Sequence, residues 1–256
     1  MLHESCSCSL VWLANAAVSN EMCIGSSMPK YVFAPSPVVA VPVRGREDLY
    51  PVRRIFCVGR NFEAHAREMG TVPDREAPFY FTKAATAYVP TGSTVSYPTM
   101  TNNYHYEMEL VVAIGSAAFQ VSIEDAPSRI FGYACGLDMT RRDLQFIARD
   151  KKHPWDVAKD FEESAVLSPI VPVSDIGHPV RNKIELRVNG IVKQSSDVSL
   201  LIHSVPAIIA DLSKYYHLLP GDLIYTGTPE GVGPVHARDD LVGSIEHIGD
   251  IALHIA

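Results

Sequence analysis

The alternation of apolar and polar positions predicts a chain built mainly of short strands. From Pro51 onward, short apolar runs are separated by residues typical of turns. The strands predicted in this way cover residues 54–58, 104–114, 130–138 and 222–226. The second of them alternates at first and then becomes entirely apolar, which is typical of a strand that enters a core.

A hairpin and a closing strand are predicted in the C-terminal part of the chain. Residues 184–188 alternate apolar with polar side chains, and Asn189-Gly190 favours a two-residue turn into a second strand over residues 191–194. Residues 245–255 supply further strand at the C-terminal end.

Helices are predicted at only a few places. Asn61 is a candidate N-cap for a short helix that Gly70 ends. Thr140 and Asp143 have the spacing of a capping box for a helix over residues 141–150.

A third helix is predicted to begin at Ser204 and to end by Pro220-Gly221, with Pro206 in its first turn. Strands and helices do not alternate in βαβαβ order, which excludes a doubly wound sheet. The predicted fold class is therefore mostly β (α+β), with few helices.

The beginning of the chain differs in composition from the rest. Residues 1–27 are rich in Ser, Cys and Ala and carry no strand or helix signals. A signal peptide begins with a basic segment, whereas the first lysine or arginine here is Lys30. We expect an unstructured or artefactual extension over residues 1–27, an extended arm over residues 28–50 that is rich in Pro and Val, and one domain over residues 51–256.

Composition and charge exclude several classes of protein. Hydrophobic residues make up 47% of the 256 residues, which rules out a predominantly disordered chain. The net charge of −7 disfavours a protein that binds the phosphates of nucleic acid. No apolar run approaches the ~18–20 residues of a membrane span. Five cysteines without a CxxC pair favour a reducing compartment, so we expect a cytoplasmic enzyme or binding domain.

Acidic residues on two predicted strands form the first candidate site. Side chains alternate along a strand, so Glu107 and Glu109 share a face and lie about 7 Å apart, where their charges repel. Asp138 ends the next strand after a series of small residues that leave room beside it. Oxygen ligands of this kind suit Mg²⁺ or Mn²⁺. The alternative is a strand whose polar face meets solvent.

The helix after Asp138 begins with two arginines, against the preference of the helix dipole for acids. Arg142 and Gln145 are three residues apart and share a face, so both could donate hydrogen bonds to an anion beside the metal. Arg141 could equally be a solvated arginine.

A histidine and a glutamate one helical turn apart form a candidate base. Glu68 can orient the imidazole of His65 and raise its basicity, as activation of water requires. The alternative at this spacing is a pair on the protein surface.

Two further features leave alternatives open. The glycine-rich residues 225–234 could present backbone N–H groups and a hydroxyl to an anion, or form a tight turn. By its pattern alone, Lys159 is a lysine that extends along the surface to solvent. The sequence has no GxSxG, HExxH or Walker A motif, which disfavours a serine esterase, a zincin and a P-loop protein.

Taken together, these motifs resemble the fumarylacetoacetate hydrolase superfamily. They run in family order from about Arg53 to Ile255, and the matching stretches are CVGRNFEAHAREMG, HYEMELVVAIG, GYACGLDMTRRDLQ, PWDVAKDF, IELRVNG and GDLIYTGTPEGVGPV. Within the superfamily the chain looks like the fumarylpyruvate hydrolases of the gentisate pathway. It departs from the family pattern at Ala84, where proline is usual, and at Glu162.

The resemblance implies a fold and a set of site residues. The fold would be a mixed β-roll core with few peripheral helices, usually in a homodimer. The cofactor would be Mg²⁺ or Mn²⁺, which Ca²⁺ could replace in a crystal. By motif position, the metal ligands would be Glu107, Glu109 and Asp138, and the base would be His65 with Glu68. The polar groups that contact the substrate's oxygens would be Arg142, Gln145 and Lys159. Thr228 would bind a substrate carboxylate.

The resemblance also implies an activity, hydrolysis of the C–C bond of fumarylpyruvate to fumarate and pyruvate. This small dicarboxylic β-diketo acid has a distal carboxylate that needs another cation, for which Lys83, Arg75 and Arg141 are candidates. The alternatives within the family are acylpyruvate hydrolysis, oxaloacetate decarboxylation, and a hydratase or isomerase step of aromatic catabolism. A non-enzymatic cation-binding β module would keep the acids without needing His65 and Glu68.

Overall fold

The computed structural model describes residues 29–70, 72 and 75–256. The chain divides into two compact units, Met1–Pro37 and Val38–Ala256. The predicted extension over residues 1–27 lies outside the described residues and stays a prediction. Residues 29–37, the described part of the first unit, contain no helix or strand. The features below belong to the second unit.

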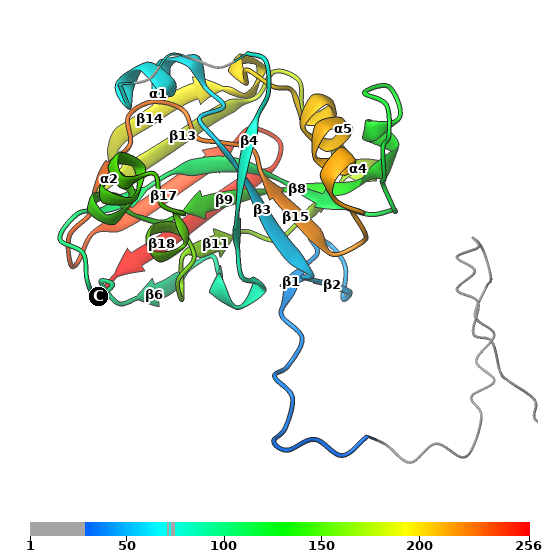
Figure 1. The fold of residues 1–256 in the computed structure, drawn as a ribbon, viewed down its shortest axis with the longest axis horizontal. Coiled ribbons are helices and arrows are strands. Elements are labelled where there is room, and N and C mark those ends of the chain that lie inside the picture. Colours follow the sequence, from blue (N-terminus) through cyan, green and yellow to red (C-terminus); the bar gives the residue numbers. More distant parts are fainter. Residues whose placement is uncertain (1–28, 71, 73–74) are drawn as a thin grey trace, which may run out of the picture. The chain divides into compact units, whose positions relative to one another are not determined.

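The largest element of the fold is an eight-stranded mixed sheet (Figure 1). Its strands in spatial order are β4 (Phe79–Lys83), β3 (Arg54–Gly59), β15 (Asp222–Tyr225), β8 (Met108–Ile114), β9 (Ile130–Asp138), β11 (Ala165–Leu167) and β5 (Tyr88–Pro90), with β12 (Val171–Pro172) also paired to β9. The pairs β15–β3 and β11–β5 are parallel, and the other pairs are antiparallel.

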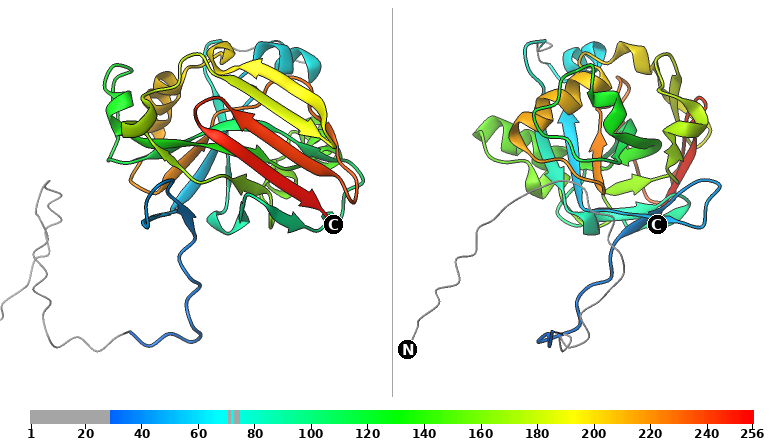
Figure 2. Two further views of the ribbon diagram at one scale, coloured as in Figure 1. Left: turned by 180° about the vertical axis from the view of Figure 1, so that it is seen from behind. Right: turned by 90° about the vertical axis from the view of Figure 1, so that its right-hand side faces the viewer.

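A five-stranded sheet faces the large one, and the two curve around a common interior (Figure 2). Its order is β14 (Ile191–Asp197), β13 (Lys183–Val188), β17 (Asp240–Ile245), β18 (Gly249–Ile255) and β6 (Ser93–Val95). The smaller sheets are β10 (Thr140–Arg141), β7 (Tyr104–Tyr106) and β16 (Gly233–Pro234), and β1 (Ala40–Pro42) with β2 (Leu49–Pro51). The predicted hairpin is confirmed, with positive φ at both turn residues, Asn189 and Gly190.

The helices are short and lie at the periphery of the sheets (Figure 1). They are α1 (Glu63–Glu68), α2 (Arg142–Lys151), α3 (Asp156–Lys159), α4 (Val173–Ile176) and α5 (Val205–Tyr215), with 3₁₀ turns at Ala85–Ala87, Ala126–Arg129 and Val198–Leu200. Among the described residues, no helix has the length and apolar character needed to cross a membrane. The predicted mostly β class and the mixed β-roll are confirmed.

Strand β8 is buried on both faces, as its apolar sequence predicts. Met108 and Leu110 join the core between the two large sheets, and Val111 joins a second core on the opposite face. The single strand predicted over residues 104–114 is divided into β7 and β8 at Glu107. This break lies at the candidate metal site.

The predicted extended arm is shorter than expected. Residues 40–51 form the β1–β2 hairpin, in which Val41 and Tyr50 are buried. The Tyr50 hydroxyl lies 2.8 Å from the Ile114 carbonyl and 3.0 Å from that of Asp222, which ties the hairpin to the large sheet. The apolar residues of this segment, which the Pro-rich composition obscured, contribute to the second core.

Two predicted helix caps are wrong. The Asn61 side chain donates to the carbonyls of His203 and Thr226, so it joins loops and does not cap α1. The Thr140 hydroxyl bonds to the Asp138 carbonyl and makes no cap bond at α2. Both side chains are fully buried, and each satisfies buried polar groups elsewhere.

The small residues before Asp138 serve packing and do not leave a space. A Cβ at Gly136 would lie 2.5 Å from a Val111 methyl and 2.6 Å from the Tyr225 ring. A Cβ at Gly132 would lie 2.2 Å from the Val171 carbonyl oxygen. The expectation that these residues open a path to the acid is therefore wrong, because neighbouring strands fill the position.

Candidate active site

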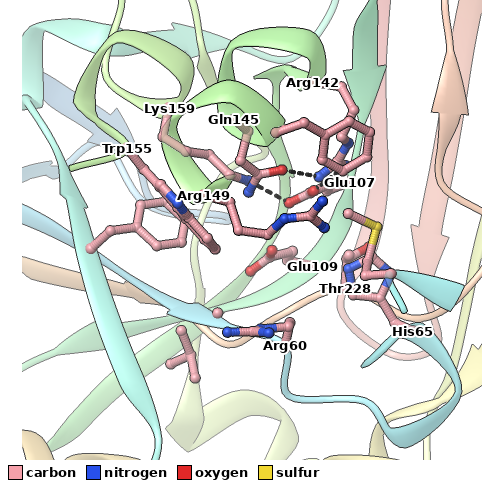
Figure 3. Close-up of a pocket in the computed structure, with 15 residues that line it drawn as sticks. Arg60, His65, Glu107, Glu109, Arg142, Gln145, Arg149, Trp155, Lys159 and Thr228 are labelled. Atoms are coloured by element: carbon pink, nitrogen blue, oxygen red, sulfur yellow. Dashed lines mark hydrogen bonds and ion pairs between the residues drawn. The ribbon is translucent and has the colours of Figure 1, made fainter. Parts of the chain in front are cut away.

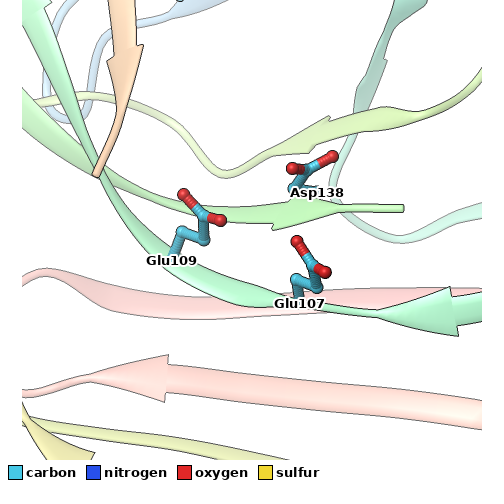
Figure 4. A group of neighbouring side chains, drawn as sticks. All are labelled: Glu107, Glu109 and Asp138. Atoms are coloured by element: carbon cyan, nitrogen blue, oxygen red, sulfur yellow. The ribbon is translucent and has the colours of Figure 1, made fainter. Parts of the chain in front are cut away.

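The three predicted acids lie together at the edge of the core (Figure 4). Glu107 stands at the break before β8, Glu109 lies on β8, and Asp138 ends the neighbouring strand β9. The Asp138 N–H donates to the Glu107 carbonyl at 2.9 Å, which fixes the two strand ends side by side. One carboxylate oxygen from each residue lies within 4.8 Å of the others, and all three residues are buried. An all-oxygen set of this kind could hold a hard divalent cation.

Three buried cations neutralise much of this acidic charge. The Lys159 amine lies 2.6 Å from Glu107 and 2.7 Å from Asp138. The Lys83 amine lies 2.9 Å from the other oxygen of Asp138, and the Arg142 guanidinium pairs with Glu107. Because Lys159 is 2% exposed, it is not the solvent-facing lysine that its pattern suggested.

The carboxylate of Glu109 has a different kind of partner from the carboxylates of Glu107 and Asp138. Its Oε2 accepts a 2.7 Å hydrogen bond from the Gly227 N–H, and no lysine or arginine in the described part of the chain pairs with it. Burial raises the pKa of Glu109 well above its usual value, and the charges of Asp138 and Glu107 raise it further. Burial alone would also raise the pKa of Glu107, but Lys159 and Arg142 hold it below its usual range.

The predicted hydrogen bond between the candidate base His65 and Glu68 is formed on α1. His65 Nδ1 lies 3.1 Å from Glu68 Oε2, and His65 is 4% exposed, which excludes a pair on the surface. Burial opposes ionisation of Glu68, but the hydrogen bonds from His65 and from the Gly231 N–H lower its pKa below the usual value. Glu68 thus fixes the imidazole and ties α1 to the glycine-rich loop.

The glycine-rich loop binds anions that belong to the protein itself. The N–H groups of Gly227 and Gly231 donate to Glu109 and Glu68, so they are not presented to a ligand as expected. Gln194 Nε2 donates to the Thr228 hydroxyl oxygen at 2.8 Å. The hydroxyl proton of Thr228 therefore remains as a donor on the pocket side.

A pocket with about 490 Å³ of empty space, part of it open to solvent, brings these groups together (Figure 3). The predicted residues that line it are His65, Glu107, Glu109, Arg142, Gln145, Lys159 and Thr228. Within the pocket Arg142 donates to both Glu107 and the Gln145 amide oxygen. The buried pairing with Glu107 is the structural reason for an arginine at the start of α2.

The three cations suggested for a distal carboxylate do not line this pocket. The Lys83 amine is fully buried against Asp138 and the Ser164 hydroxyl. Arg141 stacks on the Phe161 ring at 4.2 Å and donates to a backbone carbonyl. Arg75 pairs with Glu63 at 3.2 Å. The structure therefore places these three side chains outside the lining of the pocket.

Two arginines that the sequence analysis did not select do line the pocket, Arg60 and Arg149. Arg149 follows Arg142 by seven residues and Gln145 by four, so the helical periodicity places all three on one face of α2. That spacing could have identified Arg149 from the sequence. Arg60 follows the end of β3 with a φ of 56° and has no comparable periodic signal.

A mostly β roll with three buried carboxylates that could hold a metal ion, and with a His–Glu pair at the same pocket, has the arrangement of an enzyme active site. Residues 54–256 match the family described as "Fumarylacetoacetate (FAA) hydrolase C-terminal". The chain belongs to this family, and its relatives indicate a hydrolase. Membership of an enzyme family argues against the alternative of a non-enzymatic cation-binding β module.

The relatives of this chain have more than one named activity. A fumarylpyruvate hydrolase from Ralstonia is 57% identical over 189 residues, which cover 73% of this chain and 98% of the relative. The oxaloacetate tautomerase FAHD1 of Bos taurus is 43% identical over 196 residues, which cover 77% of this chain and 88% of the relative. The crystal structure of fumarylpyruvate hydrolase from Pseudomonas aeruginosa with Mn²⁺ and pyruvate has a TM-score of 0.86 and 46% identity, with 89% of this chain and 99% of that one covered.

Proposed function

We propose that this protein hydrolyses fumarylpyruvate to fumarate and pyruvate and uses a divalent cation held by Glu107, Glu109 and Asp138. The observation that carries the proposal is the cluster of three buried carboxylates, two of which line the same pocket as His65 of the His65–Glu68 pair. The 57% identity to a fumarylpyruvate hydrolase supports the choice of substrate.

The chemistry of the donor set fits Mg²⁺ or Mn²⁺. All three candidate ligands are carboxylates, their oxygens lie within 4.8 Å of one another, and Glu109 lacks a cationic partner among the described residues. A bound divalent ion would supply Lewis-acid polarisation of the substrate's oxygens. The Mn²⁺ in the related crystal structure supports this cofactor.

The protein's own residues account for activation of water. His65 takes a proton from water, and Glu68 holds the imidazole through Nδ1 so that Nε2 is the acceptor. The resulting hydroxide adds to the fumaryl carbonyl. The C–C bond to the pyruvyl group then breaks, fumarate is released, and the pyruvate enolate takes up a proton. One water is consumed for each fumarate and pyruvate formed.

The donors around the reacting carbonyl are already positioned. Lys159 is held by Glu107, Asp138 and the Thr140 hydroxyl, so it contributes its positive charge, and Arg142 is held by Glu107 and Gln145. Because these side chains are buried, they need little reorganisation to stabilise a developing oxyanion. The Thr228 hydroxyl is a further donor on the pocket side, suited to a substrate carboxylate.

A substrate panel tests the proposed function. The full chain, loaded with Mn²⁺, is assayed with fumarylpyruvate, acetylpyruvate and oxaloacetate, and the products are identified by NMR. We expect fumarate and pyruvate in equal amounts and the highest kcat/KM for fumarylpyruvate. Equal kcat/KM for both acylpyruvates would instead indicate a general acylpyruvate hydrolase.

A second candidate function is tautomerisation of oxaloacetate. The 43% identity to a named oxaloacetate tautomerase favours it, and the reaction needs a base and a stabilised enolate but no bond cleavage. Rapid interconversion of the enol and keto forms of oxaloacetate, without hydrolysis of fumarylpyruvate, would establish this function in place of the first.

We also propose that the protein acts as a homodimer in the cytoplasm. The family resemblance favours the dimer, which light scattering of the full chain tests directly. The buried, unpaired thiols of Cys57 and Cys135 agree with a reducing compartment. Fractionation of cells that produce the protein would locate it.

A further inference from the structure

We infer that Arg149 and Arg60 form the part of the pocket that binds the distal carboxylate of a dicarboxylic substrate. This inference rests on the proposed function and deepens it, because it identifies the residues that select a second carboxylate. Both arginines line the pocket, whereas Lys83, Arg141 and Arg75 do not. In Figure 3, Arg149 and Arg60 are drawn on opposite sides of Glu109, and Arg60 lies on the side away from the cluster that Arg142 and Lys159 form with Glu107.

The innermost cations of the pocket are engaged by the protein's own acids. Arg142 pairs with Glu107, and Lys159 pairs with Glu107 and Asp138. In the proposed function, these two side chains act at the reacting carbonyl of the substrate. A carboxylate at the far end of the fumaryl group must therefore be matched by a cation farther along the pocket.

Arg149 meets the requirements for this role. Its side chain is 43% exposed, and its Nε bonds to Asp150, whose own side chain is 69% exposed. Such an exposed ion pair contributes little, so a substrate carboxylate can compete with it. The guanidinium stacks on the Phe146 ring at 4.8 Å, and Phe146 also lines the pocket. The ring orients the planar donor edge of the arginine, which suits two-point recognition of a carboxylate.

Arg60 is positioned by a different aromatic side chain. Its guanidinium lies 4.8 Å from the Phe79 ring centre, and that ring packs so closely on Gly59 that a Cβ there would lie 2.0 Å from it. The φ of 56° at Arg60 turns the chain at the end of β3, next to the pocket. Arg60 and Arg149 thus reach one pocket from separate elements.

The experiment compares selectivity among arginine variants of the full, Mn²⁺-loaded protein. The quantity measured is kcat/KM for fumarylpyruvate divided by kcat/KM for acetylpyruvate, which lacks the distal carboxylate. We expect Arg149→Ala to lower this ratio roughly 10- to 100-fold, as loss of a charged hydrogen bond would. Arg60→Ala should lower it as well. Arg149→Lys should have an intermediate ratio, because it keeps the charge and loses the planar donor edge.

Arg187→Ala is a matched control for loss of a half-exposed arginine. Arg187 is 45% exposed and bonds to Glu185 through Nε at 2.9 Å, much as Arg149 bonds to Asp150, but it does not line the pocket. The ratio of the two kcat/KM values in Arg187→Ala should equal the ratio in the wild type. A ratio that is unchanged in both Arg149→Ala and Arg60→Ala would overturn the inference.

A binding measurement separates failure of this inference from failure of the proposed function. Fumarate and crotonate have similar shapes, but crotonate has a methyl group where fumarate has its second carboxylate. Calorimetry should show that wild type prefers fumarate and that Arg149→Ala loses this preference, whether or not fumarylpyruvate is hydrolysed. Equal affinities of wild type for the two acids would contradict the inference even if fumarylpyruvate proves to be the substrate.

Discussion

Replacing Glu109 and Glu107 with glutamine should change the stability of the metal-free protein in opposite directions. The two residues lie two positions apart, and both are buried members of the cluster that they form with Asp138. Glu107 is paired with Arg142 and Lys159, whereas Glu109 has a backbone N–H but no cationic partner among the described residues. Glutamine keeps the size of either side chain and removes its charge.

The magnitudes follow from the distances. Two like charges no more than 4.8 Å apart repel by at least about 3.5 kcal/mol at an effective dielectric constant of ~20. Part of this repulsion is already relieved by the raised pKa of Glu109, so we expect Glu109→Gln to stabilise the metal-free protein by about 1–2 kcal/mol. Glu107→Gln leaves the buried Arg142 guanidinium without a charged partner and leaves Lys159 with Asp138 alone, which should cost about 3–5 kcal/mol.

Thermal unfolding with and without metal measures both effects. In EDTA, the Tm of Glu109→Gln should rise by about 2–8 °C, and that of Glu107→Gln should fall by about 6–20 °C. Mn²⁺ at about 100 times its Kd should stabilise wild type by ~2.7 kcal/mol, and both variants should lose most of this gain. The reasoning is refuted if Glu109→Gln is destabilised as much as Glu107→Gln, or if it keeps the full response to Mn²⁺.

The pH dependence of metal-free stability has a definite sign. The pKa of Glu109 is raised in the folded state, so its stabilising contribution is complete below the unfolded pKa and is lost as the pH rises through the folded one. The stability of wild type relative to Glu109→Gln should therefore fall as the pH increases. A constant difference between their unfolding free energies across this range would show that Glu109 is not perturbed.

Three further variants test other parts of the structure. His65→Ala should lower kcat by roughly 10²–10⁴ while the Mn²⁺-induced rise in Tm is kept; near-normal kcat would assign activation of water to another group. Gly136→Ala should lower the Tm, since its Cβ would lie 2.5 Å from Val111 and the strain should cost about 1–3 kcal/mol; an unchanged Tm would show that the strands adjust. A chain that begins at Met28 should match the full chain in kcat and Tm, and a large loss of either would show that residues 1–27 contribute to the domain.

The sequence predicts the strands and the grouping of the three acids well, because the signals for both are local. Apolar runs mark β8 and β9, and motif order places Glu107, Glu109, Asp138 and His65. Side-chain partners across the fold are not local. The side-chain oxygen of Asn61 could have capped a helix, and only the packed structure shows that it accepts from the His203 N–H instead.

The same limit applies to the cations of the site. The sequence offers several lysines and arginines near the motifs but does not show which of them an acid already occupies. Lys83 is occupied by Asp138, whereas Arg149 reaches the pocket from the same helical face as Gln145. The glycine-rich loop shows the same limit. The sequence predicts that its N–H groups could bind an anion, but not that this anion is the protein's own Glu109 carboxylate.

Turnover of fumarylpyruvate by the full chain tests the central claim most directly. The protein is stripped of metal, and formation of fumarate and pyruvate is followed before and after addition of Mn²⁺. We predict little turnover in EDTA, recovery with Mn²⁺, and equal amounts of the two products. Full turnover in EDTA with no metal bound to the protein, or no cleavage of fumarylpyruvate with Mn²⁺ bound, would contradict the account.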